Sequence, residues 1–250
     1  MWPTIPIHIG LMKDEIHLYS VMAAFGFTHL FWGVEMCARS NKMDRNDTGN
    51  FLYALGFTIV GAYSFSLVAT QLLYGKDHPF GTIAVMPAVV GGLVTLVIAT
   101  QCYRLPLKVW LPMSIPFLCF AHAWGRLGCF LGGCCYGKPT DSFLGMQFPE
   151  KSLACQAHGH VPVHPTQLYE MVLLVALGLT LNFAIPAAHR IYSYLLIYGL
   201  GRFGIEFLRG DDRGNLGLIP GLSPSQQFCL LFITAGAVLA WRQHLARSRA

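Results

Sequence analysis

Long apolar stretches alternate with short polar segments along nearly the whole chain, and this pattern predicts helices that cross a membrane. A membrane-spanning helix needs about 20 mainly apolar residues. Stretches of this kind lie at 17–37, 51–74, 82–101, 107–131, 167–186, 190–208 and 223–241. Because backbone polar groups in lipid must bond within their own segment, we predict an all-α integral membrane protein with seven transmembrane helices around a lipid-binding cavity.

These stretches and their connections fill the chain, so we predict a single membrane domain over residues 1–250. The basic tail RQHLARSRA and the larger share of lysine and arginine on its side predict a cytoplasmic C-terminus and an N-terminus outside. The start MWPTIPIHIG has no basic region and no cleavage site, so we expect no secretory signal peptide. The long connection 134–165 then lies outside, and its apolar run FLGMQF favours a partly ordered lid.

The composition supports a membrane protein. Hydrophobic residues make up 54% of the chain and charged residues only 12%, about half the roughly 25% that is usual for soluble domains. The net charge of +5 is consistent with membrane topology and contact with anionic lipids, and we expect no nucleic-acid partner.

Arginines inside predicted spans are the first candidate chemistry. An arginine at the bilayer centre costs about 2.5–3.5 kcal/mol, so Arg126 and Arg202 need a protein pocket. Glu206 and Arg209 follow Arg202 at helical spacing, which predicts one helix face carrying guanidinium, carboxylate and guanidinium. These three arginines outnumber Glu206 and Glu170, and an excess of guanidinium groups near an interface favours an external anion. A phosphate suits their forked geometry, and a lipid head group is its commonest source in a membrane.

Two further stretches place polar side chains near the same boundary. His122 and Cys129 share a helix face with Arg126, and VHPTQLYE brings Gln167 and Glu170 to the start of the fifth span. Two plainer interpretations stay open: Arg126 and Glu206 as an ion pair between helices, and a tyrosine belt at the interface.

The eight cysteines allow three interpretations. Cys129, Cys134 and Cys135, with Cys155 or a histidine of HGHVPVH, supply enough ligands for a metal, but adjacent cysteines rarely bind one ion together. A disulfide from Cys155 to Cys134 or Cys135 is favoured over a metal if the compartment is oxidising. The remaining interpretation is packing of small, soft side chains in a glycine-rich bend.

Four stretches, taken together and in order, resemble one family. IHLYSVMAAFGF, GRLGCFLGGCCYG, HPTQLYE and GRFGIEFLRGD are similar to motifs of the prolipoprotein diacylglyceryl transferases, and the resemblance covers about residues 12–242. It implies an enzyme of the bacterial cytoplasmic (inner) membrane that transfers diacylglyceryl from phosphatidylglycerol to the lipobox cysteine thiol of a prolipoprotein. Glycerol phosphate is released, and the resemblance implies no metal and no soluble cofactor.

The resemblance also implies residue roles. Arg126 corresponds to an arginine expected to hold the lipid phosphate, and Arg202 to one near the reacting head group, with Glu206 orienting it. Together with His122 these are the predicted catalytic residues. The predicted substrate-binding residues are Arg209, Tyr169, Glu170, Gln167, His164, Tyr19, His17, Gly91 and Gly92.

Three departures from the family pattern matter. Val90 stands before Gly91 and Gly92, where the family has a histidine that is a candidate base. Cys129 and Cys134 replace an asparagine and a glutamate. His122 stands one turn before Arg126, where the family has a small or apolar residue, and we hypothesise that it, or less favourably His164, replaces the base.

These departures keep two alternatives open. One is a lipid transferase that uses the same donor on a different acceptor. The other is a paralogue without activity that binds phospholipid or lipoproteins.

Overall fold

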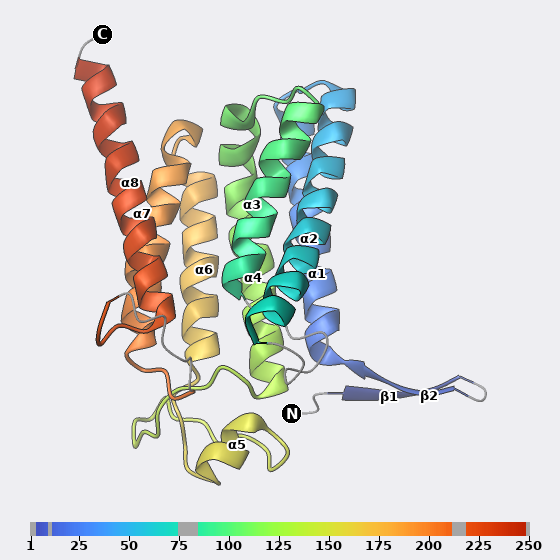
Figure 1. The fold of residues 1–250 in the computed structure, drawn as a ribbon, viewed down its shortest axis with the longest axis vertical. Coiled ribbons are helices and arrows are strands. Elements are labelled where there is room, and N and C mark those ends of the chain that lie inside the picture. The colour runs from blue at the N-terminus through green and yellow to red at the C-terminus, as the bar shows by residue number, and fades with distance from the viewer. Residues whose placement is uncertain (1–3, 10–11, 75–84, 212–218, 249–250) are drawn as a thin grey trace. The chain divides into compact units, whose positions relative to one another are not determined.

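The computed structural model describes residues 4–9, 12–74, 85–211 and 219–248, so residues 82–84 of the expected third span and the end of the basic tail lie outside the described residues. Helices dominate this part of the chain (Figure 1). The elements are β1 (Thr4–Ile9), β2 (Met12–His17), α1 (Leu18–Ser40), α2 (Arg45–Tyr74), α3 (Val85–Cys102), α4 (Leu107–Gly132), α5 (Leu153–His158), α6 (Thr166–Phe183), α7 (Ala187–Glu206) and α8 (Pro224–Ser248).

Several helices are long and apolar enough to cross a membrane, which supports a membrane protein. Among the described residues, four meet both criteria: α1, the Arg45–Leu72 part of α2, α6 and α8. Pro87–Cys102 within α3 is apolar but shorter. α4 and α7 have 26 and 20 residues, but they contain ionisable side chains that lower their mean hydropathy. Seven spans and the orientation of the termini therefore stay predictions.

The expectation of an all-α chain is wrong at the N-terminus, where β1 and β2 form an antiparallel hairpin. The register runs from Thr4 opposite His17 to Ile9 opposite Met12. The reason lies in TIPIHI, in which isoleucine occupies every second position, and this period of two is typical of a strand. α1 consequently begins at Leu18, directly after the hairpin.

Contacts divide the chain into two compact units, residues 31–113 and residues 1–30 with 114–250. In the first unit α2 and α3 pack closely through small residues. A Cβ atom at Gly91 would lie 2.9 Å from the carbonyl oxygen of Gly61 and would overlap the side chain of Phe65. Phe51 and Trp110 stack in the same unit, with 4.7 Å between their ring centroids.

The second unit contains α6, α7 and α8, which lie side by side (Figure 1). Glycines permit the close contacts here as well. A Cβ at Gly199 of α7 would lie 3.3 Å from the carbonyl oxygen of Cys229 in α8. In the same unit α4 packs against the first turns of α1, where a Cβ at Gly128 would lie 3.0 Å from the ring of Tyr19.

Backbone hydrogen bonds join the end of α4, the start of α6 and the end of α7. Gly137 N–H donates to the carbonyl of His164 at 2.8 Å, and Lys138 N–H donates to that of Leu208 at 2.8 Å. Gly210 N–H donates to the Tyr136 carbonyl at 3.2 Å. These bonds fix the helix ends that carry the polar motifs.

The connection 134–165, expected as a partly ordered lid, forms a small hydrophobic cluster. Tyr136, Phe148, Ala154 and Val163 are buried together, with Phe130 packed against them. Its apolar run remains largely uncovered, with Phe143 94% exposed. The last residue of the run, Phe148, belongs to the buried cluster, whereas the part before it leaves apolar surface exposed.

Candidate functional site

A buried carboxylate in α6 forms the centre of the site. Glu170 Oε1 lies 3.0 Å from Arg126 Nε of α4, and Glu170 Oε2 lies 3.4 Å from Arg202 Nε of α7. Tyr198 of α7 donates its hydroxyl to Glu170 Oε1 at 2.8 Å. Since the Glu170 side chain has no exposed surface, its charge is balanced by the protein rather than by water. Three helices thus meet on one ionised group.

A second carboxylate extends this cluster along α7. Arg202 Nη1 lies 2.6 Å from Glu206 Oε2, one helical turn further on. Ser223 Oγ–H donates to Glu206 Oε1 at 2.7 Å. Arg202 Nη2 donates to Ser225 Oγ at 3.4 Å. We name Arg126, Glu170, Tyr198, Arg202 and Glu206 the Glu170 cluster.

The start of α8 is fixed by its own sequence, which explains how Ser223 is placed. Ser223 Oγ accepts from Gln226 N–H at 3.2 Å, and Gln226 Oε1 accepts from Ser223 N–H at 3.0 Å. This reciprocal pair is a capping box, and Pro224 occupies the first helical position, where a missing N–H costs nothing. The hydroxyl that caps α8 also binds Glu206.

His122 lies beside the Glu170 cluster, as the shared helix face with Arg126 predicts. Its Nε2 lies 3.6 Å from Glu170 Oε1, and its side chain is 32% exposed. The ring meets that of Tyr198 edge-on, with 5.6 Å between centroids. His122 is therefore the partly accessible titratable group at the cluster.

The prediction for Arg209 is wrong in its geometry. α7 ends at Glu206, so Arg209 does not continue the helix face of Arg202. Instead Arg209 Nε and Nη2 donate to the two carboxylate oxygens of Asp211, each at 2.8 Å. Burial raises the pKa of Asp211, and the Arg209 guanidinium partly offsets this effect.

This pair also corrects the expected excess of positive charge. Three arginines were expected to face only Glu170 and Glu206, but Asp211 supplies a third carboxylate. The opposing charges among these residues are therefore equal in number. The carboxylates are unevenly distributed among the arginines, because the single carboxylate of Glu170 is shared by Arg126 and Arg202.

The VHPTQLYE stretch holds the start of α6 against the end of α4. Gln167, fully buried, donates its amide to the carbonyl of Cys134 at 2.5 Å, and Thr166 Oγ1 donates to that of Cys135 at 2.8 Å. His164 Nδ1 lies 3.1 Å from the Tyr169 hydroxyl. Pro165 is the N-cap of α6 and makes no side-chain bond.

Four further predicted residues also lie outside the Glu170 cluster. Gly91 and Gly92 belong to α3 in the unit 31–113, where Gly91 packs against Phe65. His17 ends β2, and its side chain is exposed. Tyr19 is 50% exposed and interacts electrostatically with Arg126.

The cysteines of GRLGCFLGGCCYG gather in one place. The Sγ atoms of Cys129, Cys134 and Cys135 all lie within 4.8 Å of one another. We name these three residues the cysteine cluster. Cys155, the expected disulfide partner of Cys134 or Cys135, is a free thiol. Hydrogen bonds from the thiols of Cys129 and Cys134 lower the pKa of Cys135, as do the guanidinium groups of Arg209 and Arg126.

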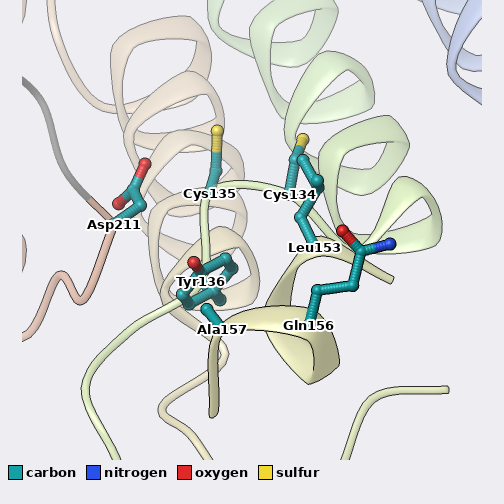
Figure 2. A pocket seen from close by; sticks show the side chains of 7 residues that line it. All are labelled: Cys134, Cys135, Tyr136, Leu153, Gln156, Ala157 and Asp211. Atoms are coloured by element: carbon teal, nitrogen blue, oxygen red, sulfur yellow. The ribbon is translucent and has the colours of Figure 1, made fainter. Parts of the chain in front are cut away.

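A cavity of about 520 Å³ adjoins the cysteine cluster, and Figure 2 shows the residues that line it. Cys134, Cys135 and Tyr136 come from the turn after α4. Gln156 comes from α5 and Asp211 from the segment after α7. Burial raises the pKa of Tyr136. The cavity thus brings Cys134, Cys135 and Asp211, the partner of Arg209, to one surface.

Tyr198, Ser223 and Asp211 are site residues that the sequence pattern did not predict. Tyr198 stands one turn before Arg202, a spacing that places it on the same face. The SPSQ stretch carries the capping-box pattern that fixes Ser223. Asp211 stands two residues after Arg209, but no helical or strand periodicity relates them, so the pattern gave no signal.

The fold and the cluster define a class: a membrane protein with several apolar helices and a buried arginine–carboxylate centre between three of them. Comparison with known proteins gives the family. The model of the prolipoprotein diacylglyceryl transferase family matches residues 6–242. The chain belongs to this family, whose members are transferase enzymes, as the quoted motifs predicted.

Individual relatives agree with the family. The phosphatidylglycerol–prolipoprotein diacylglyceryl transferase of Clostridium tetani is 36% identical over 244 residues, covering 92% of this chain and 94% of that protein. The corresponding protein of Geobacter sulfurreducens is 30% identical over 234 residues, covering 86% of each. Phosphatidylglycerol–prolipoprotein diacylglyceryl transferase 2 of Clostridium perfringens is 34% identical over 166 residues, which span 65% of this chain but only 62% of that relative.

Proposed function

We propose that this chain transfers the diacylglyceryl group of phosphatidylglycerol to the lipobox cysteine thiol of prolipoproteins, releasing glycerol phosphate. The observation that carries the proposal is the sharing of one buried carboxylate, Glu170, by two guanidinium groups from different helices. A fixed pair of guanidinium groups is suited to a phosphate whose charge increases during reaction. Family membership supplies the donor and acceptor classes.

The reaction needs three operations from the protein. The acceptor thiol must lose its proton, because the thiolate is the nucleophile. Its sulfur then attacks the glycerol carbon that bears the phosphate ester, so a C–S bond forms while a C–O bond breaks. Glycerol phosphate leaves with the bonding electrons, and its developing charge must be stabilised.

We assign phosphate binding to Arg126. Its side chain is 15% exposed, against 5% for Arg202. Its Nε is the atom that faces Glu170, which leaves its two terminal amino groups for a ligand. These amino groups can donate together to phosphate oxygens. Glu170 acts as a positioning residue that fixes the plane of the guanidinium.

Arg202 and Glu206 form the second part of the machinery. Arg202 contacts Glu170 on one side and Glu206 on the other, which holds its guanidinium in one orientation without reorganisation during reaction. We assign it to stabilising the departing phosphate ester. Glu206 and Ser223 keep it in place.

We assign the thiol proton to His122. It is the partly exposed imidazole at the Glu170 cluster, and its neighbour Glu170 stabilises the imidazolium that forms. Arg209, Tyr169, Gln167, His164, Tyr19 and His17 are proposed to shape the donor and acceptor surfaces around this centre. Gly91 and Gly92 are proposed to act through helix packing.

The membrane setting is part of the proposal. We place the chain in the bacterial cytoplasmic membrane with seven spans, an N-terminus outside and a cytoplasmic C-terminus. The apolar side chains exposed on α2, α3 and α8, such as Leu72, Leu93 and Trp241, then face lipid. The segment 134–165 lies at the outer boundary, where the lipobox segment arrives.

Purified protein in phosphatidylglycerol nanodiscs with a synthetic lipobox peptide tests the proposal. Mass spectrometry should find a diacylglyceryl adduct on the peptide cysteine, none on a matched serine peptide, and none in nanodiscs of phosphatidylcholine. An adduct on another nucleophile would show that the acceptor is not the lipobox cysteine. If no adduct forms and phosphatidylglycerol binding still depends on Arg126, the chain is a lipid-binding protein without transferase activity.

A further inference from the structure

The turn after α4 aims two adjacent cysteines to the same side. In an extended or helical chain neighbouring side chains point apart, but Cys135 has φ 63° and Gly133 has φ 67°. Figure 2 shows the Cys134 and Cys135 thiols directed alike, away from Tyr136 and Gln156. A left-handed conformation at a residue with a side chain costs of order 1–3 kcal/mol. Packing of small side chains gives no reason for that cost.

Neighbouring elements hold this turn in place. The carbonyls of Cys134 and Cys135 accept hydrogen bonds from Gln167 and Thr166 of α6. Ala154 N–H of α5 donates to the Gly133 carbonyl at 3.2 Å. The convergence of the thiols is therefore imposed by the fold.

The spacing of the three thiols suits one cation. A metal–sulfur distance of about 2.3 Å in a tetrahedral site places its sulfurs about 3.8 Å apart. The Sγ atoms of the cysteine cluster already lie within 4.8 Å of one another. Side-chain rotations that move the sulfur atoms by about 1 Å therefore close the site. Three thiolates select soft, thiophilic cations such as zinc over magnesium or calcium.

The surrounding charge suits a thiolate site. Three thiolates around a divalent cation carry one net negative charge. The guanidinium groups of Arg126 and Arg209 both act on Cys135 electrostatically, and Arg209 Nη1 is buried without a hydrogen-bond partner among the described residues. Positive groups on two sides offset the charge of a metal–thiolate centre.

The fourth ligand position has an obvious occupant. Sites with three protein ligands and one open position are typical of catalytic zinc, and Cys134 and Cys135 line the 520 Å³ cavity. We propose that Cys129, Cys134 and Cys135 bind a zinc-class cation whose open position takes the acceptor thiol as a thiolate. This inference rests on the proposed diacylglyceryl transfer.

The step balances without a further reactant. On coordination the acceptor thiol loses its proton to water in the cavity, because a coordinating thiol is deprotonated by the metal. Its sulfur then attacks the glycerol carbon, the C–O bond to phosphate breaks, and the thioether product leaves the metal. That water passes the proton on to His122, which remains its final acceptor.

The first experiment measures metal binding by the full chain in nanodiscs after chelator treatment. Zinc is titrated against a coloured competing chelator, and the expected stoichiometry is one zinc per chain. Cys134→Ser and Cys135→Ser should each weaken binding at least about tenfold. Cys102→Ser, which changes an exposed cysteine in α3, should leave it unchanged. Sub-stoichiometric binding, or equal binding by all variants, overturns the site.

A second measurement avoids dependence on variant folding. Wild-type protein is alkylated with and without zinc, and modified cysteines are located by mass spectrometry. Zinc should protect the cysteine cluster and leave Cys102 reactive. Equal modification with and without zinc overturns the proposal, as does a disulfide between two members of the cluster in the purified protein.

The third experiment tests the fourth ligand. In the cobalt-substituted protein the thiolate-to-cobalt absorption should increase when the lipobox peptide is added, and not with its serine counterpart. No increase overturns the role in acceptor binding. Full transfer by zinc-free protein overturns the metal inference and leaves the proposed function standing. Zinc binding without transfer to any peptide overturns the proposed function instead.

Discussion

The Glu170 cluster and the cysteine cluster lie in the same compact unit but are built on opposite principles. In the Glu170 cluster, charged groups from α4, α6 and α7 are paired with one another at 2.6–3.4 Å and are almost entirely buried. In the cysteine cluster, three thiols converge beside a cavity. The first is electrostatically complete before substrate arrives, whereas the second has the ligands of a centre that a cation would complete.

The two clusters also differ in what holds them. The Glu170 cluster rests on helices, so its geometry follows from regular spacing such as that of Arg202 and Glu206. The cysteine cluster rests on a strained turn that α5 and α6 stabilise through its carbonyls. The difference implies that the first resists small backbone changes and that the second depends on single residues of the turn.

The largest expected effect follows from removing the central carboxylate. Glu170→Ala removes the carboxylate that Arg126 shares with Arg202 and leaves Arg202 with Glu206 alone. Breaking such a buried contact costs about 3–5 kcal/mol. We expect a strong fall in the thermal unfolding temperature in detergent and loss of transfer. The control is Glu35→Ala, which breaks an exposed Arg39 pair and should shift unfolding little.

A smaller effect is expected at the neutral member of the same cluster. Tyr198→Phe removes the hydroxyl that donates to Glu170, and a hydrogen bond to a charged group is worth about 1.5–3 kcal/mol. Thermal unfolding should report this loss, and transfer should slow while phosphatidylglycerol binding persists. An unchanged unfolding temperature would show that Glu170 does not need this donor.

Substitutions at two neighbouring glycines test whether the strained turn aligns the cysteines. Gly133 has φ 67°, and a Cβ there would lie 2.5 Å from Cβ of Ser152. Gly133→Ala should therefore cost of order 1–3 kcal/mol and abolish zinc-dependent protection of the thiols. Gly132→Ala, with nothing within 4 Å of the added carbon, is the matched control. If both variants behave alike, the strained turn is not what aligns the cysteines.

The smallest expected effect is a pH dependence at the edge of the cavity. Burial raises the pKa of Asp211 above its ordinary value. A carboxyl whose pKa is raised on folding binds its proton more tightly in the folded state, so protonation stabilises the fold. Relative to Asp211→Asn, wild-type protein should gain stability as the pH falls through the folded pKa, with no further gain below the ordinary aspartate pKa. The unfolding temperatures of both proteins are measured across this pH range. If the inference is wrong, the two temperatures change in parallel with pH.

Much of the Glu170 cluster could be predicted because helical periodicity is visible in sequence. The spacing of His122 and Arg126, and of Arg202 and Glu206, placed these pairs on common faces. The shared partner Glu170 was identified as buried charge, but its central position depends on the packing of α6 between α4 and α7, which no local pattern encodes.

The predictions that failed lie where regular structure ends. Arg209 was assigned to a helix face because nothing in GRFGIEFLRGD signals that α7 stops at Glu206. The convergence of Cys134 and Cys135 depends on two left-handed residues, Gly133 and Cys135, which sequence spacing does not reveal. The hairpin of β1 and β2 was overlooked although its alternating isoleucines carried the signal.

The most direct measurement of the central claim is the single-turnover rate of diacylglyceryl transfer in Arg126→Lys and Arg202→Lys proteins. Lysine keeps the charge but has neither the Nε that faces Glu170 nor the forked amino groups. Loss of a preorganised donor lowers the rate about 10²–10³-fold. Arg39→Lys is the control, since Arg39 makes an exposed pair at the same helical spacing as Arg202 and Glu206. The account predicts that both cluster variants lose at least about a hundredfold in rate with phosphatidylglycerol still bound, while Arg39→Lys retains the wild-type rate. Wild-type rates in both cluster variants would contradict it.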